Sequence, residues 1–188
     1  MSNLKLPAKL VSLFFFLLVF QSCLKMSEHI EDSTAGLNGS FEISQDGLPV
    51  NWLLYTPNIV PKSEFEMLLD TKIYKDGKQS LKFKVNRCTE TGGWMSPGFT
   101  NQFFDKGEGI YKLSMWVKNE ESEFIISAGG VSYNKGNMIT LIKSKEQISD
   151  WKLLEYEIEV PSENSFRLEV NILQPGTFWI DDIRIDKL

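Results

Sequence analysis

The chain has 188 residues, which suits one domain of ordinary size and excludes two sizeable ones. Its composition, 42% apolar and 24% charged, is that of a globular protein rather than a disordered or fibrous one. The formal net charge of −5 argues against a nucleic-acid binder, which would carry a basic face. Two cysteines and one histidine argue against a disulfide framework and against a Cys/His zinc site.

The first 22 residues have the features of a secretory signal. Lys5 and Lys9 precede an apolar run over residues 10–20, which as a helix spans only about half of a bilayer core. The segment at 19–23, Val-Phe-Gln-Ser-Cys, resembles the bacterial lipoprotein signal. That resemblance implies cleavage before Cys23, acylation of its thiol (a palmitate-type anchor), and a place in the cell envelope. We expect the outer membrane, on its periplasmic side or at the cell surface; an ordinary cleaved signal is the alternative.

Residues 23–36 lack an apolar period and predict a flexible tether after the lipidated cysteine. From residue 37 to residue 188 the dominant pattern is alternation of apolar and polar side chains. It is clearest over residues 81–85, 111–117, 154–160 and 166–172. Alternation with period two predicts strands that bury one face and expose the other, as in antiparallel sheets.

Turn residues separate these runs. Asp46-Gly47, Asp76-Gly77 and Pro175-Gly176 are typical turn sequences, and the segment 134–137 predicts a hairpin between strands near 123–133 and 137–144. About ten short strands in about 150 residues favour an all-β fold, a two-sheet antiparallel sandwich or jelly roll. We find no internal repeat and no second domain boundary after residue 37.

Several blocks, in order, resemble the galactose-binding-like jelly rolls, and among them the carbohydrate-binding modules attached to xylanases and cellulases. They read N-G-S-F-E at 38–42, G-L-P-V-N-W at 47–52, G-K-Q-S-L at 77–81, Y-K-L-S-M-W-V-K at 111–118 and W-I-D-D-I at 179–183. Together they cover nearly all of residues 37–188. The resemblance implies a β-sandwich and a glycan ligand, although one fold carries many functions.

The same resemblance implies a structural calcium that ties the first strand to the last, at Glu42, Asp181 and Asp182. Three carboxylates supply part of the six to eight oxygens that calcium prefers. Adjacent aspartates on a regular strand point to opposite faces, so both reach one ion only at a bulge. Ile180 lies in one apolar phase and Ile183 in the other, which predicts a bulge at the pair. The alternative is that these carboxylates hold neighbouring loops without a metal.

Sugar rings stack on aromatic side chains, and their hydroxyls need groups that donate and accept hydrogen bonds. Residues expected to contact a glycan lie on exposed strand phases, in a glycine-rich loop or beside the hairpin turn: Trp94, Trp116, Tyr133, Arg167 and Asn171. The alternative for each aromatic is ordinary packing against a sheet.

We expect no enzyme. The single histidine, His29, lies in the tether, so a Ser-His-Asp or Cys-His system in the domain lacks a base. We expect Cys88 to be a structural thiol rather than a nucleophile. The sequence therefore predicts a lipid-anchored module that binds a polysaccharide or oligosaccharide, with no nucleic-acid partner. A protein-interaction module of an envelope complex is the first alternative, and a small glycan-active hydrolase or lyase is the second.

Overall fold

The computed structural model describes residues 34, 36–132 and 135–188, all within the unit Glu31–Leu188. The predicted signal, the lipidation site Cys23, nearly all of the tether and the predicted ligand residue Tyr133 lie outside the described residues. Among the described residues, no helix is long and apolar enough to cross a membrane.

Twelve strands and one turn of 3-10 helix make up the described part of the domain. β1 and β2 have only two residues each, whereas β7, β10 and β12 have 12, 13 and 12 residues. Their bounds are β1 Ser44–Gln45, β2 Leu48–Pro49, β3 Leu53–Tyr55, β4 Glu64–Asp70, β5 Ser80–Arg87, η1 Gly93–Met95, β6 Gly98–Phe103, β7 Gly109–Glu120, β8 Phe124–Ser132, β9 Lys135–Ser144, β10 Ile148–Val160, β11 Ser165–Ile172 and β12 Gly176–Lys187.

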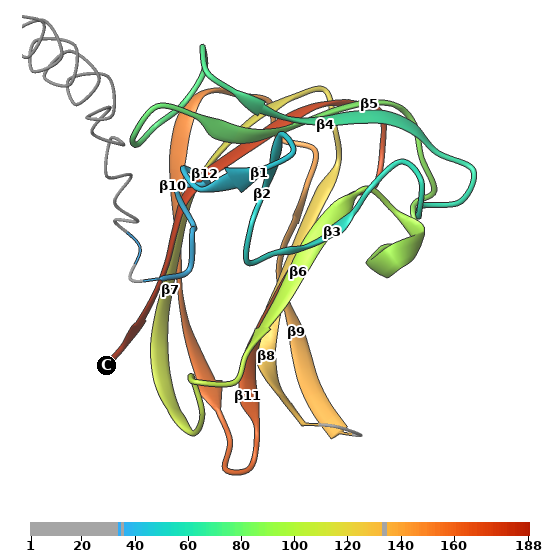
Figure 1. Ribbon diagram of the computed structural model, residues 1–188. Helices are drawn as coiled ribbons and strands as arrows, with labels where there is room; N and C mark the ends of the chain where they lie inside the picture. The colour runs from blue at the N-terminus through green and yellow to red at the C-terminus, as the bar shows by residue number, and fades with distance from the viewer. Residues whose placement is uncertain (1–33, 35, 133–134) are drawn as a thin grey trace, which may run out of the picture. The chain divides into compact units, whose positions relative to one another are not determined.

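Ten of the strands form two antiparallel sheets that face each other (Figure 1). The first, called here the β7 sheet, has the order β10-β7-β12-β5-β4, and the second, the β11 sheet, has the order β3-β6-β11-β8-β9. β1 and β2 pair separately. The predicted fold class, an all-β two-sheet antiparallel sandwich, is confirmed, with somewhat more and longer strands than expected.

The core lies between the two sheets and is built by the predicted alternation. On β7, Leu113, Met115 and Val117 are fully buried, and on β11 Phe166 and Leu168 are too. Aromatic rings bridge the sheets, because Phe83 of the β7 sheet stacks on Phe99 of the β11 sheet with ring centroids 6.3 Å apart. Burial of these faces leaves the alternate side chains of each strand on the two outer faces of the sandwich.

Two local predictions are also confirmed. β8 and β9 form the predicted hairpin, although residues 135–137, expected in its turn, are paired with β8 as part of β9. The register of β12 against β7 shifts between Asp181 and Arg184, and Asp182 takes a left-handed backbone conformation with φ 48°. This is the bulge that the change of apolar phase between Ile180 and Ile183 predicts.

Candidate functional site

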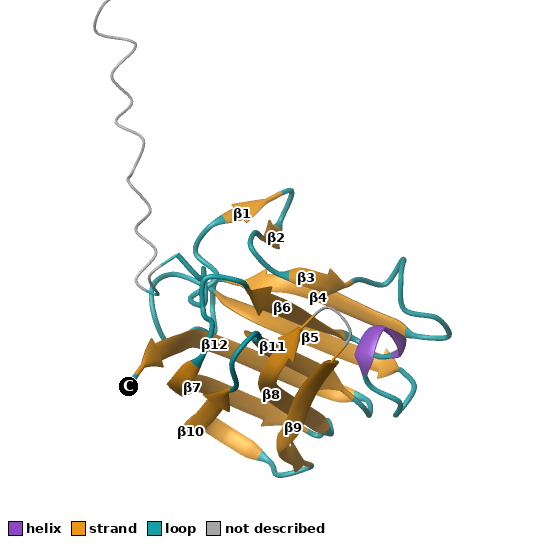
Figure 2. Ribbon diagram, turned by 90° about the horizontal axis from the view of Figure 1, so that it is seen from below, coloured by secondary structure: helices purple, strands orange, loops and turns teal. Residues whose placement is uncertain are grey.

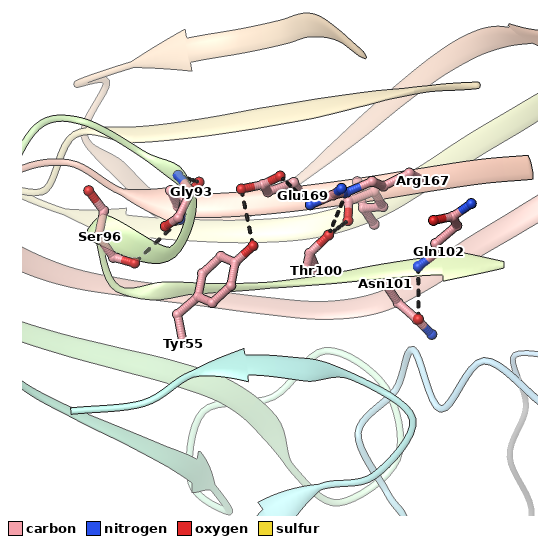
Figure 3. Close-up of polar contacts among 10 residues, drawn as sticks. Tyr55, Gly93, Ser96, Thr100, Asn101, Gln102, Arg167 and Glu169 are labelled. Atoms are coloured by element: carbon pink, nitrogen blue, oxygen red, sulfur yellow. Dashed lines mark hydrogen bonds and ion pairs between the residues drawn. The ribbon is translucent and has the colours of Figure 1, made fainter. Parts of the chain in front are cut away.

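The outer face of the β11 sheet carries a row of polar side chains from three neighbouring strands. β11 supplies Arg167 and Glu169, and the register places Gln102 and Thr100 of β6 directly beside them. Tyr55 lies on β3, which pairs with the other edge of β6. These five residues are called here the polar row, and Figure 3 shows them side by side.

Hydrogen bonds connect most of the polar row into one network (Figure 3). The Arg167 guanidinium donates from Nε to Thr100 Oγ1 over 3.2 Å and from Nη2 to Glu169 Oε2 over 3.1 Å. The Tyr55 hydroxyl donates to the other Glu169 oxygen over 3.3 Å. The pKa of Tyr55 is raised to about 12 by burial and by the Glu169 charge, so this hydroxyl keeps its proton at neutral pH. The network fixes a donor, Arg167, beside an acceptor, Glu169. Tyr55 and Thr100 are buried, so the half-buried Gln102, Arg167 and Glu169 are the members of the row that a ligand can reach.

A hollow of about 210 Å³ opens at one end of the polar row. Thr100, Gln102 and Arg167 line it together with two strongly exposed apolar side chains. Leu53 is 62% exposed and Phe104 is 80% exposed. Large apolar side chains that are exposed to solvent beside fixed polar groups are typical of a binding surface.

At the other end of the polar row, the η1 turn presents Trp94, which is 60% exposed. The turn is held by Asn171, whose side chain is only 3% exposed. Asn171 accepts the Gly93 N–H and donates to the Gly93 carbonyl, each over 2.9 Å. Gly92 and Gly93 both have positive φ, 79° and 57°, which favours glycine at these positions. A Cβ on Gly93 would lie 3.7 Å from Glu169 Oε1, so the turn borders the polar row.

The structure brings together three of the five predicted ligand residues, Trp94, Arg167 and Asn171. Trp116 lies apart from these three residues, half-buried on the outer face of the opposite β7 sheet. The Lys75 ammonium lies 4.0 Å from the centroid of the Trp116 ring and covers it. Asn171 is buried and bonded to the turn, so we expect it to position Trp94 rather than to touch a ligand itself.

Sequence reasoning missed the rest of the site: Leu53, Tyr55, Thr100, Gln102, Phe104 and Glu169. Glu169 shares the outward phase of Arg167 and Asn171 on one strand, so the alternation already pointed to it. The others come from β3, from β6 or from the residue after β6. Only the strand order β3-β6-β11 reveals that these residues lie together.

The carboxylates predicted to bind calcium accept hydrogen bonds from protein groups. Glu42 Oε1 accepts the backbone N–H of Lys78 over 2.8 Å and that of Gln79 over 3.1 Å. Asp182 Oδ1 accepts from Arg184 Nε over 2.8 Å. Among the residues that the structure describes, no group of three acidic, histidine or cysteine side chains is arranged to hold a metal ion.

Asp181 is fully buried and accepts three backbone N–H groups. Its Oδ2 accepts from Lys75 over 2.6 Å and from Asp76 over 3.0 Å, and its Oδ1 accepts from Asp182 over 2.8 Å. Burial raises the pKa of Asp181 to about 7, against the opposing effect of these hydrogen bonds. A carboxylate has about four lone-pair sites, and three of those of Asp181 already accept N–H groups, which leaves this side chain little capacity for calcium. Calcium binding stays an untested prediction.

No protein-family model and no curated protein matches this chain. Solved structures do match it. The CBM22-1–GH10 modules of Clostridium thermocellum xylanase 10B, complexed with xylohexaose, match at 16% identity and TM-score 0.58, over 79% of this chain and 28% of that one. The CBM22-2 xylan-binding domain of Paenibacillus barcinonensis Xyn10C matches at 15% identity and TM-score 0.55, over 76% of this chain and 95% of that one.

The domain has the jelly-roll fold of carbohydrate-binding modules. A chain from tailspike protein 4 of bacteriophage CBA120, an enzymatically active domain, also matches at 16% identity and TM-score 0.58, over 80% of this chain and 21% of that one. The chain therefore spans about a quarter of the xylanase and tailspike chains but nearly all of the isolated xylan-binding domain. At these identities the similarity concerns the fold, and function has to be argued from the site.

Proposed function

We propose that the domain binds a polysaccharide or oligosaccharide, without catalysis, along the outer face of the β11 sheet. The observation that carries this proposal is the polar row itself, flanked by exposed apolar side chains at both ends. Trp94 lies at one end, and Leu53 and Phe104 at the other. A sugar chain has the matching chemistry, because its hydroxyls alternate with the apolar C–H faces of its rings.

The dimensions favour a chain over a single sugar. Arg167 and Asn171 are four residues apart on one strand, which corresponds to about 13 Å at about 3.3 Å per residue. The Trp94 turn and the Leu53–Phe104 hollow extend the surface beyond both ends of this span. A ligand that contacts all three parts is therefore longer than one sugar ring.

Xylan is the first polysaccharide to test, because several of the similar structures are named as xylan-binding domains. The polar row also suits binding better than bond cleavage. Its carboxylate, Glu169, is ion-paired with Arg167 and hydrogen-bonded to Tyr55, so it is held as an acceptor rather than as a proton donor.

Affinity electrophoresis of the full chain in gels that contain soluble xylan tests this function. We expect the unaltered protein to be retarded, and Trp94→Ala and Arg167→Ala to weaken binding about tenfold, the equivalent of about 1.4 kcal/mol. Trp116→Ala is the matched control, because Trp116 lies on the opposite face beneath Lys75. Absence of retardation in xylan and in every other polysaccharide tried, or an equal loss with Trp116→Ala, would refute the proposal.

We further propose that Cys23 carries a lipid anchor that holds the domain in the cell envelope. The support is the sequence around Val19–Cys23. Metabolic labelling with palmitate should mark the protein, and Cys23→Ala should abolish the label. A labelled Cys23→Ala variant would contradict the anchor and leave the glycan-binding proposal untouched.

A further inference from the structure

We propose a second interaction surface, at the side of the sandwich where the edge strands β9 and β10 lie. Its partner is an extended peptide segment in which apolar side chains alternate with basic ones. The segment would add a sixth strand to the β7 sheet beside β10. This inference does not depend on glycan binding by the opposite edge and face of the β11 sheet.

The two sheets end unevenly on this side. β9 and β10 are the last strands of their sheets, and Figure 2 places both on the side away from β3 and β4. Across the sandwich, β10 packs against β8, the strand just inside β9. β9 therefore projects one strand further than β10 and forms an overhang. The position beside β10 and beneath β9 has the size of one strand, because neighbouring strands lie about 4.8 Å apart and facing sheets about 10 Å apart.

Because β9 extends beyond β10, apolar surface on the core-facing side of β9 is exposed to solvent. Ile139 of β9 pairs with Ala128, which is in the buried phase of the sheet, yet Ile139 is 46% exposed. A hollow of about 250 Å³ lies in the angle between the two sheets, lined by Ile139, Ile158, Pro161, Gly129, Asn137 and Glu159. Inward-facing apolar side chains of an added strand would fill this hollow and cover Ile139.

The free edge of β10 can supply the main-chain hydrogen bonds. β10 pairs with β7 on one side only, in unbroken register from Lys152 to Val160. An edge strand of this kind leaves N–H and C=O groups directed outward at every second residue. A peptide that pairs there uses them, and its own alternate side chains then decide which partner fits.

The negative charge along β10 determines which kind of strand can pair with it. The outward phase of β10 carries Glu155, Glu157 and Glu159, all exposed. Pairing with β10 of a second copy would place two glutamate rows on one face, which like-charge repulsion disfavours. Lysine or arginine at the outward positions of a partner strand would instead meet three carboxylates, of which Glu155 already forms an ion pair with Lys112 of β7. The glutamate row therefore disfavours a copy of the chain and favours a basic segment.

The test uses the full chain and a fluorescent ten-residue peptide that alternates valine and lysine, with a valine–glutamate peptide as the charge control. Fluorescence anisotropy should show binding of the valine–lysine peptide alone, and amide hydrogen exchange should slow along β10. Ile139→Lys should weaken binding about tenfold or more, and Glu157→Gln by a smaller factor. The matched controls, exposed residues at the far side of the sandwich, are Ile59→Lys and Glu66→Gln, which should bind as the parent does.

Several results would overturn the proposal. They are equal binding of the valine–glutamate peptide, no binding of either peptide, protection along β4 rather than β10, or an equal loss with Ile59→Lys. A concentration-dependent dimer that Ile139→Lys dissociates, detected by sedimentation, would show that a second copy is the occupant. Loss of xylan binding leaves all of these readouts unchanged, so the two proposals fail independently.

Discussion

Asn171 shows how a single buried amide positions an exposed aromatic. Its side chain accepts from and donates to the same residue, Gly93, and so fixes the turn that presents Trp94. Ser96 supports the turn from the other side, since its hydroxyl accepts the Gly92 N–H over 2.9 Å and donates to the Thr89 carbonyl over 2.6 Å. A fixed platform loses little conformational freedom when a ligand binds, which favours affinity.

Asn171→Ala should therefore reduce both stability and glycan binding. Two backbone groups of Gly93 lose their partner, which we expect to lower the free energy of unfolding by about 1–3 kcal/mol in urea titrations. Xylan affinity should fall about as far as in Trp94→Ala, because the ring is no longer held in place. Asn86→Ala, at an exposed position on β5, is the control and should change neither quantity by much. Normal xylan affinity in Asn171→Ala would show that the turn does not need this amide.

At the scale of elements, three carboxylates hold the segment 71–79 that connects β4 to β5. Asp70 accepts the backbone N–H groups of Lys72 and Ile73, Asp181 holds the middle of the segment, and Glu42 holds its end. Two of the three come from distant parts of the chain, near the first and the last strand. They connect the segment before β1 and strand β12 to this connection by direct hydrogen bonds.

Asp70 also supports β12, because its Oδ2 accepts from Trp179 Nε1 over 3.0 Å and lies 3.2 Å from Lys82 Nζ. Burial by itself would raise the pKa of Asp70, but hydrogen bonds from Trp179, Lys72, Lys82 and Ile73 together lower it to about 2. The folded-state pKa thus lies below the ordinary value of 3.8, so ionisation of Asp70 favours the folded state. This contribution is present above about pH 4 and is lost as the pH falls through 2.

Asp70→Asn should destabilise the protein by about 2 kcal/mol at pH 7, because the amide –NH₂ would face the Trp179 and Lys82 donors. Urea unfolding of both proteins should show this difference shrinking between pH 4 and pH 2. Glu66→Gln on the same strand is the control, since Glu66 is exposed on β4. A difference that stays constant down to pH 2 would contradict the linkage to Asp70 ionisation.

At the scale of the whole molecule, the sandwich presents three different surfaces. The outer face of the β11 sheet has the half-buried and buried residues of the polar row, with the exposed aromatic side chains Trp94 and Phe104 at its ends. The outer face of the β7 sheet covers its tryptophans with lysines, since Lys75 lies over Trp116 and Lys82 over Trp179. The side with β9 and β10 exposes an apolar overhang beside a row of glutamates. Ligand binding is therefore expected on the first and third surfaces and not on the second.

Removal of metal ions should leave the molecule equally stable. The carboxylates near the chain's first and last strands already accept backbone N–H groups, so we expect EDTA to leave the melting temperature unchanged in differential scanning calorimetry. An ion that binds only the folded state would stabilise it by mass action. A fall of several degrees in EDTA, restored by excess calcium, would show that such an ion binds and would return Glu42, Asp181 and Asp182 to the role first predicted.

The sequence by itself determined the fold class, the phase of β7, β10 and β11, the β8–β9 hairpin and the bulge at Asp181–Asp182. These features depend on interactions between near neighbours: alternation, turn residues and a change of apolar phase. It also pointed to Trp94 and Arg167, which differ from their neighbours within their own segments and which the structure places at one face. β6 is not apparent from the sequence, because Gly98-Phe99-Thr100-Asn101-Gln102-Phe103 is too polar to show clear alternation.

Only the tertiary structure decided which of the predicted residues share one outer face. In the sequence, Trp116 and Arg167 are both outward-facing residues on alternating strands, and nothing local tells which sheet each strand joins. The pairing of β6 with β11, and of β3 with the other edge of β6, brings Tyr55 and Thr100 close to Arg167, across more than 60 residues of chain. Strand order is set by packing between distant segments, and the cover of one tryptophan by a lysine from another loop is set the same way. Period-two alternation is a local property of each strand and does not encode that order.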